Sequence, residues 1–320
     1  MSKDTLYAIG EALIDFIPNE SGCEFRYVSG FSPALGGAPA NVCGAFAKLG
    51  GKGKMITQLG DDPFGHKIAD ELAEAGIGTE YISFTTKANT ALAFVSLAAD
   101  GNRTFSFYRN PSADMLLEPS QVRPEWFEEA YALHFCSVSL GDCPMKEAHE
   151  TAIDYALKAG AMISFDPNLR FPLWPDRDAL YRRVWEFIPK AHILKISDEE
   201  LEFITDKTNI EEALDQLFVG NVQLILFTCG ADGAYAYTKN VKGYAASQKV
   251  QAIDTTGAGD AFAGSILHCL YRDKITSAGL FNLKSDELEK YLAFANKYCA
   301  ASVQKKGAIA SYLTIDEVDF

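Results

Sequence analysis

Residues 254–264 read Asp254-Thr-Thr-Gly-Ala-Gly-Asp-Ala-Phe-Ala-Gly264, and this segment guides our interpretation of the whole chain. Gly257, Ala258 and Gly259 come directly before an apolar pattern of helical spacing, carried by Phe262, Ile266, Leu267 and Leu270. Glycine has no Cβ, so the backbone N–H groups of such a turn approach a ligand closely, and the N-terminus of a helix carries partial positive charge. The segment therefore predicts a pocket for an anion such as a phosphoryl group.

Asp260 lies in the first turn of the predicted helix, beside this pocket. A carboxylate there can accept a proton from a hydroxyl while the pocket stabilises a phosphoryl group in transfer. The alternative is a glycine-rich turn in which Asp260 only caps the helix. The segment is not a dinucleotide-binding fingerprint, because Phe262 stands where the third glycine would be, and no Gly-Lys-Ser/Thr of a Walker loop follows. A dehydrogenase is therefore disfavoured.

The composition is that of a soluble globular protein, and we interpret residues 1–320 as a single domain. The net charge of −14 argues against a nucleic-acid partner, because a strong anion repels phosphate backbones. The seven cysteines are scattered and indicate neither a disulfide nor a zinc framework. No window approaches the ~18 apolar residues of a membrane helix, and the first apolar run is too short for a signal peptide. We therefore expect a cytoplasmic protein without a membrane partner.

Short apolar runs alternate with segments of helical periodicity, which predicts a mostly parallel sheet covered by helices on both faces. The predicted strands are 6–9, 13–17, 55–59, 133–138, 162–165, 193–196 and 224–228, followed by a hairpin at 234–237 and 244–246. The predicted helices are 43–49, 64–75, 145–159, 176–187, 198–204, 210–218 and 286–303. Ligands are expected at the carboxyl ends of the strands.

The pattern changes to a period of two between residues 90 and 109, and Asp100-Gly101 predicts the turn of a hairpin there. Residues 20–32 are polar and are expected to form a loop or a small hairpin. We interpret residues from about 12–34 and about 90–112 as a small β lid inserted in the domain. A lid is useful in a kinase because it excludes water that would otherwise take the phosphoryl group.

Two polar residues near the start of the chain are candidates for ligand contacts. Asp15 interrupts an apolar run, where a buried carboxylate is costly unless it has partners. Asn41 follows two glycines at a helix start, and its amide can bond hydroxyls in both directions. The alternatives are an edge residue that faces water and an asparagine solvated beside a tight turn. The pattern alone does not decide between them.

Polar residues also follow two of the predicted strands. Asp166, Asn168 and Arg170 come directly after the strand 162–165, and Lys195 to Glu200 end the strand 193–196. A lysine there can neutralise nucleotide phosphates, and a glutamate can hold Mg²⁺ through waters. The alternative is a solvated acidic helix start, where glutamate is favoured anyway.

Six motifs, in this order along nearly the whole chain, make it similar to the ribokinase (PfkB) family of sugar kinases, and most similar to its bacterial fructokinases. They are Gly36-Gly-Ala-Pro-Ala-Asn-Val42, Leu59-Gly-Asp-Asp-Pro-Phe-Gly65, Asp166-Pro-Asn-Leu-Arg170, Lys195-Ile-Ser-Asp-Glu-Glu200, Thr228–Gly233 and Asp254–Asp260. The last is the family's signature. The resemblance implies a ribokinase-like three-layer α/β sandwich with a mostly parallel central sheet and a small β lid.

The resemblance also implies roles for individual residues. Asp260 would be the general base, and the backbone N–H groups of Gly257, Ala258 and Gly259 would form the anion hole for the γ-phosphoryl. The sugar would contact Asp15, Gly36, Gly37, Asn41, Phe105, Arg109, Asn168 and Arg170. ATP would lie along Lys195, Ser197, Thr228, Gly230, Gly233 and Asn296. Glu200 would help to hold Mg²⁺, and a monovalent cation, commonly K⁺, would lie near Asp254, Thr256, Gly307 and Ser311.

The activity that the resemblance implies is ATP-dependent phosphorylation of fructose, at its 6-hydroxyl. Another acceptor, such as aminoimidazole riboside or 2-keto-3-deoxygluconate, stays open, as does a catalytically silent sugar-binding relative. The run 165–174 favours fructose, and the intact Asp260 disfavours the silent relative. The wider family often has asparagine where Ser197 stands, which leaves the Mg²⁺ arrangement open. Dimers are common in such families, so we expect a homodimer.

Overall fold

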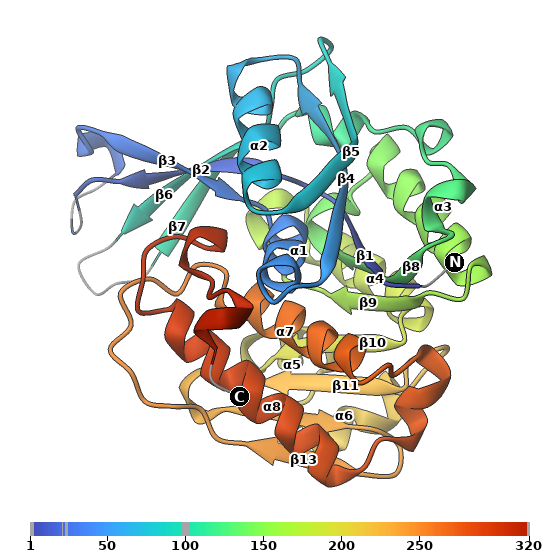
Figure 1. Cartoon of the computed structure of the whole chain (residues 1–320). Coiled ribbons are helices and arrows are strands. Elements are labelled where there is room, and N and C mark those ends of the chain that lie inside the picture. Colours follow the sequence, from blue (N-terminus) through green and yellow to red (C-terminus); the bar gives the residue numbers. More distant parts are fainter. Residues whose placement is uncertain (1–2, 21, 23–24, 98–102, 319–320) are drawn as a thin grey trace.

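The computed structural model describes residues 3–20, 22, 25–97 and 103–318, and its centre is a nine-stranded sheet (Figure 1). Its strands lie in the order β13 (Lys242–Ala245), β12 (Ala234–Tyr237), β11 (Leu224–Thr228), β10 (Ile193–Ser197), β9 (Met162–Asp166), β8 (Ala130–Cys136), β1 (Thr5–Ile9), β4 (Lys52–Gly60) and β5 (Ile77–Thr85). Neighbouring strands are parallel except where β12 pairs with β11 and β13. The central strands β1, β8 and β9 are wholly buried, as expected for parallel strands covered on both faces.

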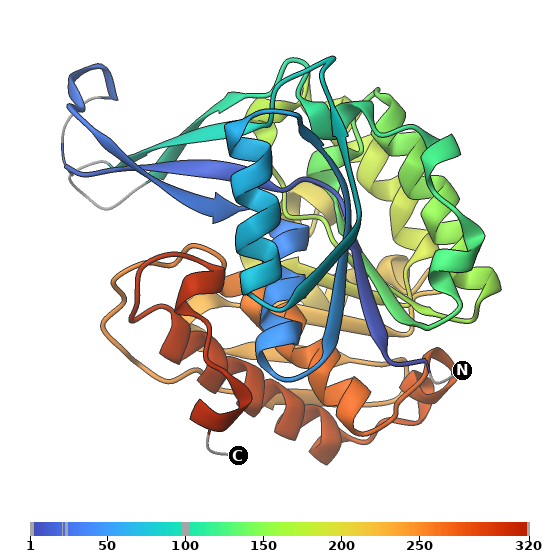
Figure 2. The ribbon, with the colours of Figure 1, turned by 45° about the horizontal axis from the view of Figure 1, so that its top comes forward.

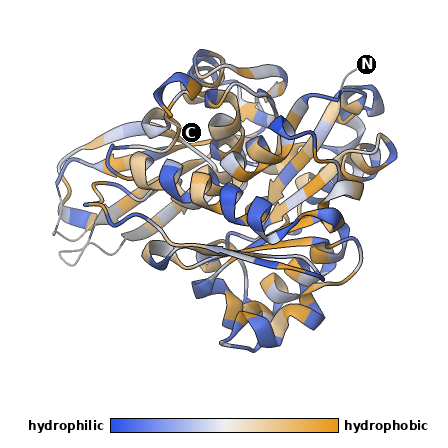
Figure 3. Ribbon diagram, turned by 60° about the horizontal axis from the view of Figure 1, so that its bottom comes forward, coloured by the Kyte–Doolittle hydropathy of each residue, from blue (hydrophilic) through white to orange (hydrophobic). Residues whose placement is uncertain are grey.

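Helices cover both faces of this sheet (Figure 2). One face packs against α3 (Pro144–Lys158), α4 (Arg177–Phe187), α5 (Asp198–Thr205) and α6 (Ile210–Leu217). The other face packs against α1 (Ala38–Lys48), α2 (Pro63–Glu74), α7 (Ala258–Arg272) and α8 (Ser285–Ser302). Figure 3 shows hydrophobic and hydrophilic residues alternating along the outer helices, which is the pattern of helices with one buried side.

Several helices begin where the sequence supplies a cap. Asp62 accepts hydrogen bonds from the backbone N–H groups of Phe64 and Gly65 at the start of α2, and Asp176 accepts one from Ala179 in α4. Proline occupies the first position of α2 and α3, where no backbone donor is needed. These local signals explain why the predicted starts of α2 and α4 lie within one residue of the observed ones.

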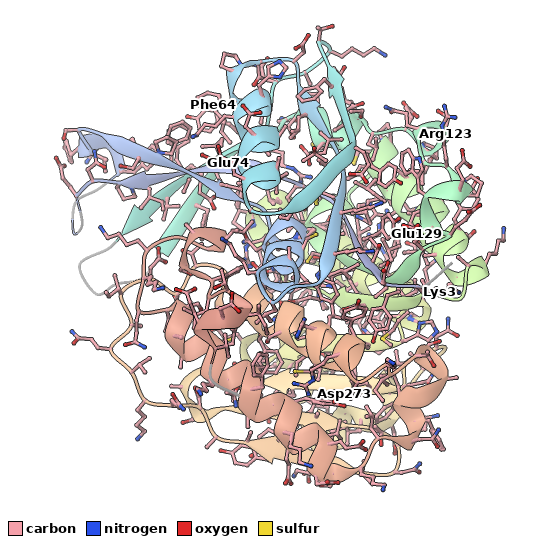
Figure 4. All side chains as sticks on the ribbon, in the orientation of Figure 1. Lys3, Phe64, Glu74, Arg123, Glu129 and Asp273 are labelled. Atoms are coloured by element: carbon pink, nitrogen blue, oxygen red, sulfur yellow. The ribbon has the colours of Figure 1, made fainter. Side chains whose placement is uncertain are left out.

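A second, four-stranded sheet extends from one side of the body, and we call it the lid (Figure 1). Its strands lie in the order β3 (Phe31–Gly36), β2 (Leu13–Pro18), β6 (Leu92–Leu97) and β7 (Arg103–Tyr108). The Phe16 and Phe94 rings stack at 4.7 Å within it. Phe64 on α2, labelled in Figure 4, lies 5.6 Å from the Phe16 ring, so aromatic contacts join the lid to the body.

The predicted fold class, a mostly parallel α/β sheet with a small β layer, is confirmed. That residues 1–320 form one kinase domain stays a prediction, as does the extent of the lid. No helix in the described part of the chain is long and apolar enough to cross a membrane. The predicted turn at Asp100-Gly101 lies outside the described residues.

Two strands differ from the sequence prediction. The edge strand β5 was not expected, because its half-exposed residues give no continuous apolar run. Residues 20–32 were expected to form a loop or a small hairpin, but residues 31 and 32 belong to β3, which pairs with β2 along its full length. The hydrogen-bond partners of β3 lie on β2, and no local pattern in residues 31–36 predicts this pairing.

Candidate active site

A cavity of about 560 Å³ lies where the carboxyl ends of the large sheet, the starts of α1 and α7, and the lid meet. The predicted site residues on its wall are Asp15, Gly37, Asn41, Phe105, Asn168, Arg170, Lys195, Thr256, Gly257, Ala258, Gly259 and Asp260. Glu11, Leu13, Phe107, Val138 and Glu199 complete much of the remaining wall. Most of the residues predicted for the sugar and the phosphoryl group thus share one cavity.

The start of α7 has the backbone that the glycine segment predicts. Gly257 precedes the helix in the left-handed region, with φ at 73°. A Cβ there would lie 2.5 Å from the Tyr312 hydroxyl and 2.7 Å from the Ala308 Cβ, so a side chain is excluded. The Tyr312 hydroxyl donates to the Gly257 carbonyl at 2.8 Å and holds the loop. The positive end of α7 therefore faces the cavity through a short, fixed loop.

Asp260 is 8% exposed, although it lies on the cavity wall. Its carboxylate accepts hydrogen bonds from Asn41 Nδ2 at 2.9 Å and from Asn168 Nδ2 at 3.4 Å. Burial raises the pKa of Asp260, while the Asn41 hydrogen bond and the charges of Lys195 and Arg170 oppose the rise. A carboxylate with a raised pKa, held in place by two amides, is suited to take a proton from a hydroxyl.

Lys195 at the end of β10 brings a positive charge beside the loop. Its Nζ lies 2.8 Å from Asp166 Oδ2, and a Cβ on Gly259 would lie 3.2 Å from the same Nζ. Burial alone would lower the pKa of the Lys195 ammonium, but the carboxylates of Asp166, Glu200 and Asp260 outweigh burial and raise it. The ammonium therefore stays charged next to Gly259, where a phosphate oxygen would be neutralised.

Glu200 is engaged by the protein on both of its carboxylate oxygens. Oε1 accepts from the Leu169 backbone N–H at 2.8 Å, and Oε2 accepts from the Ser197 backbone N–H and hydroxyl at 3.0 Å each. Ser197 and Glu200 thus form the capping box of α5 and tie it to the end of β9. Glu199, next to it, lies on the cavity wall.

The predicted sugar residues of β2, β3 and α1 lie together. A Cβ on Gly36 would lie 2.2 Å from Asp15 Oδ2, so glycine there leaves room for that carboxylate. Gly37 has φ at 111°, and a Cβ on it would lie 2.4 Å from the Glu11 carbonyl. Within the described residues, the buried Asn41 Oδ1 has no hydrogen-bond partner, although its Nδ2 is bound to Asp260. A ligand hydroxyl in the cavity would supply that partner.

Arg109 is placed differently from the other predicted sugar residues. It does not line the cavity, and its guanidinium donates to Asp114, to the Val138 carbonyl at 2.9 Å and to the Ser139 hydroxyl at 3.0 Å. The Arg109 side chain is 5% exposed. This arrangement argues against direct contact between Arg109 and a sugar.

The residues predicted for the nucleotide lie farther along the sheet. Thr228 ends β11, Gly230 and Gly233 have positive φ in the turn that follows, and Asn296 Nδ2 donates to the Ala245 carbonyl at 2.8 Å. None of these four lines the 560 Å³ cavity. Only Lys195 of the predicted nucleotide residues does.

Three of the four residues predicted for a monovalent cation are joined by hydrogen bonds. Asp254 Oδ1 accepts from the Thr256 N–H at 2.8 Å, and Asp254 Oδ2 accepts from the Gly307 N–H at 3.0 Å. Ser311, four residues after Gly307 in the sequence, is buried, and its hydroxyl donates to the Ala308 carbonyl at 2.8 Å. The Asp254 carboxylate thus fixes the loop that precedes Gly257.

Several residues of the site were not predicted to act in it, and three of them make informative contacts. Glu11 lines the cavity, Asp166 pairs with Lys195, and Tyr312 holds Gly257. Asp166 stands in one of the family-like motifs, so its position was a usable signal. Glu11 and Tyr312 reach the site through contacts across 128 and 55 residues, to Ser139 and Gly257, and no local pattern reveals such contacts.

A buried carboxylate beside the positive end of a helix, at the carboxyl edge of a parallel sheet and under a small β layer, is an arrangement suited to phosphoryl transfer on an α/β fold. The model of the pfkB family of carbohydrate kinases matches residues 3–315, so the chain belongs to this family. The chain is 43% identical over 314 residues to "Probable fructokinase-2" of Arabidopsis thaliana, covering 98% of this chain and 94% of that protein.

Solved structures resemble the whole chain as well. A fructokinase with bound ATP from Xylella fastidiosa superposes with a TM-score of 0.90 at 35% identity, covering 98% of this chain and 97% of that one. A fructokinase from Vibrio cholerae O395 with bound fructose, ADP and calcium ion superposes with a TM-score of 0.86 at 30% identity, covering 98% and 97%. The expected family and the expected class of enzyme, a phosphotransferase acting on a sugar hydroxyl, are thereby confirmed.

Proposed function

We propose that this protein transfers the γ-phosphoryl group of ATP to the 6-hydroxyl of fructose. Relatives named fructokinase, similar over nearly the full chain, support fructose as the acceptor. The observation that carries the chemistry is the buried Asp260 carboxylate at the start of α7, on the wall of a cavity that also holds Asn41 and Lys195. A cavity of about 560 Å³ is within the size range of small-molecule sites.

In this mechanism the sugar hydroxyl lies between the Asp260 carboxylate and the γ-phosphoryl group, which the loop at the start of α7 holds. Asp260 accepts the hydroxyl proton as the oxygen attacks the γ-phosphorus, and the bond from that phosphorus to ADP breaks. The positive end of α7 stabilises the charge on the transferred group. The Ala258 N–H donates to the Thr255 carbonyl at 3.2 Å, so Gly257 and Gly259 are the stronger candidates for direct contact with the phosphoryl.

Sugar recognition is assigned to residues of β2, α1 and the lid that line the same cavity. Asp15 would accept hydrogen bonds from sugar hydroxyls, and Asn41 Oδ1 would accept one while its Nδ2 keeps Asp260 in place. Phe105 of the lid would cover an apolar side of the ring. Asn168 and Arg170 lie on the wall as further contacts, whereas Arg109 would act only indirectly.

ATP would approach along Ser197, Thr228, Gly230, Gly233 and Asn296, with Lys195 at its terminal phosphates. Among the residues that the structure describes, no group of three or more His, Cys, Asp or Glu side chains is arranged to hold a metal ion. Mg²⁺ would therefore be held mainly by ATP and water, with Glu199 or Glu200 acting through water. A K⁺ ion near Asp254, Thr256, Gly307 and Ser311 would stabilise the loop before Gly257. Kinase activity should then be higher in K⁺ than in tetramethylammonium, and comparing the two tests this site.

The direct test is ADP release with Mg·ATP and K⁺ on fructose, ribose, glucose, 2-keto-3-deoxygluconate, adenosine and aminoimidazole riboside. We expect strong turnover on fructose only. Turnover on another compound alone would keep the mechanism and replace the acceptor. Sugar binding without any turnover would indicate a silent relative and would overturn the proposal.

Light scattering would test the expected homodimer, and cell fractionation would test the expected cytoplasmic location.

A further inference from the structure

The chain passes between the body and the lid at four places, and hydrogen bonds join all four. It enters the lid after Glu11 and leaves it before Ala38, then enters again after Asn89 and leaves at Arg109. These crossings are more than 90 residues apart at the extremes, so only tertiary contacts hold them in register. We call the side chains that make these contacts the root network: Glu11, Arg109, Ser112, Asp114 and Ser139. Ser112 belongs to it because its hydroxyl donates to Asp114.

The network is continuous and almost fully buried. Arg109 Nε donates to Asp114 Oδ2 at 3.0 Å, and Arg109 Nη2 donates to the Ser139 hydroxyl at 3.0 Å. The Ser139 hydroxyl in turn donates to Glu11 Oε2 at 2.8 Å. Glu11, Asp114 and Ser139 are each at most 2% exposed. Buried groups of this kind are costly to leave unpaired, so the crossings at Glu11 and Arg109 are fixed together.

The same network reaches the sugar end of the cavity. Glu11 Oε1 accepts from the Ala38 N–H, at the start of α1, at 3.3 Å, and three residues farther along that helix Asn41 donates to Asp260. Glu11 itself lines the cavity, as does Val138, whose carbonyl accepts from Arg109. On the other side, the Ala113 N–H donates to the Asn89 carbonyl at 2.8 Å, beside the start of β6. One connected set of bonds therefore touches α1, the lid and the cavity wall.

We propose that Glu11 is a positioning residue that couples the sugar-binding start of α1 to the lid through Ser139 and Arg109. This inference rests on the proposed sugar kinase activity. The Glu11 carboxylate has one oxygen on α1 and the other on the path to Arg109, so a shift of either element changes its bond to the other. Sugar bound at Asn41 then stabilises the lid strand β7, which places Phe105 over the cavity. The guanidinium of Arg109 acts on the sugar only through this path.

Ser139→Ala is the sharpest variant, because it removes the link and leaves both the Arg109–Asp114 pair and the Glu11–Ala38 bond. Glu11→Gln removes the charge and keeps the shape of the side chain. Thr205→Val is the matched control, since it removes a buried hydroxyl whose partners, the Leu201 carbonyl and the Lys207 N–H, lie within α5 and just after it. We expect the KM for sugar to rise roughly tenfold in Ser139→Ala and Glu11→Gln, with a smaller change in kcat and none in the KM for ATP. A fall in kcat together with equal rises in the KM for sugar and the KM for ATP would indicate a merely structural role and would overturn the proposal.

Hydrogen exchange of backbone amides separates this inference from the proposed function. In the wild-type protein, sugar should protect α1 together with strands β6 and β7. In Ser139→Ala, sugar should still protect α1 but no longer protect β7, and exchange of β7 without sugar should exceed that of Thr205→Val. Wild-type exchange of β7 in Ser139→Ala, with and without sugar, would contradict the coupling. A wild-type protein that phosphorylates no sugar would refute the proposed function. The exchange of β7 without sugar would still test whether the root network stabilises the lid.

Discussion

The two ends of the cavity are built in different ways. The proposed phosphoryl end is built mainly from a short continuous segment, in which Asp254 fixes the loop, Gly257 precedes α7 and Asp260 lies in the first turn of that helix. The sugar end brings together Glu11, Asp15, Asn41 and Phe105 from separate segments of the body and the lid. At the first end, the large sheet holds the charged Lys195 in place. At the second end, contacts between distant segments determine the shape of the cavity. Variants at the first end should therefore change kcat or the KM for ATP, and variants at the second should change the KM for sugar.

The largest effect is expected at the phosphoryl end. Asp260→Asn keeps the shape of the side chain and removes the base, so kcat should fall by roughly 10²–10⁴. Steady-state ADP release on the active sugar measures it, with Asp70→Asn on the exposed side of α2 as the control. Full activity of Asp260→Asn would show that another group takes the proton.

Lys195 tests whether positive charge at this end serves ATP. Lys195→Met should raise the KM for ATP by roughly 10- to 100-fold, the value of a hydrogen bond to a charged group. The single variant leaves Asp166 buried without its partner, so the double variant Lys195→Met/Asp166→Asn is needed to restore stability. An unchanged KM for ATP in a stable double variant would place the terminal phosphates elsewhere.

A smaller and different effect is expected at the sugar end. Asp15→Asn should raise the KM for sugar by about tenfold, because the amide replaces a charged acceptor, with little change in the KM for ATP. Measuring both constants in the same preparation supplies the internal control. A drop in kcat alone would mean that the two ends are not separate in function.

The smallest expected effect is on stability, and its sign follows from the pKa of Asp260. Burial raises that pKa in the folded protein above the unfolded value of about 4, so the folded state holds the proton more tightly. Stability therefore falls as pH rises from the unfolded pKa through the folded one. Urea unfolding of wild type and Asp260→Asn at several pH values should show the wild type losing stability relative to the variant over that range. Parallel curves would indicate that Asp260 is not perturbed.

The difference between the two ends also explains what the sequence could predict. Residues 254–260 form a local turn and helix start that end in Asp260, and their geometry follows from glycine and helix electrostatics. The structure places Lys195 beside this segment. β3 and Glu11 depend on partners distant in sequence, so their places could not be read from local patterns. Arg109 shows the same limit, because its partner Asp114 and the Ser139 hydroxyl turn a candidate sugar contact into part of the root network.

The measurement that most directly tests the separation of the two ends is calorimetric sugar binding to Asp260→Asn. The account predicts an unchanged dissociation constant for fructose in a variant that has lost its turnover, because Asp260 serves the phosphoryl end. Loss of fructose binding together with turnover would contradict it and would make Asp260 a residue that holds the sugar.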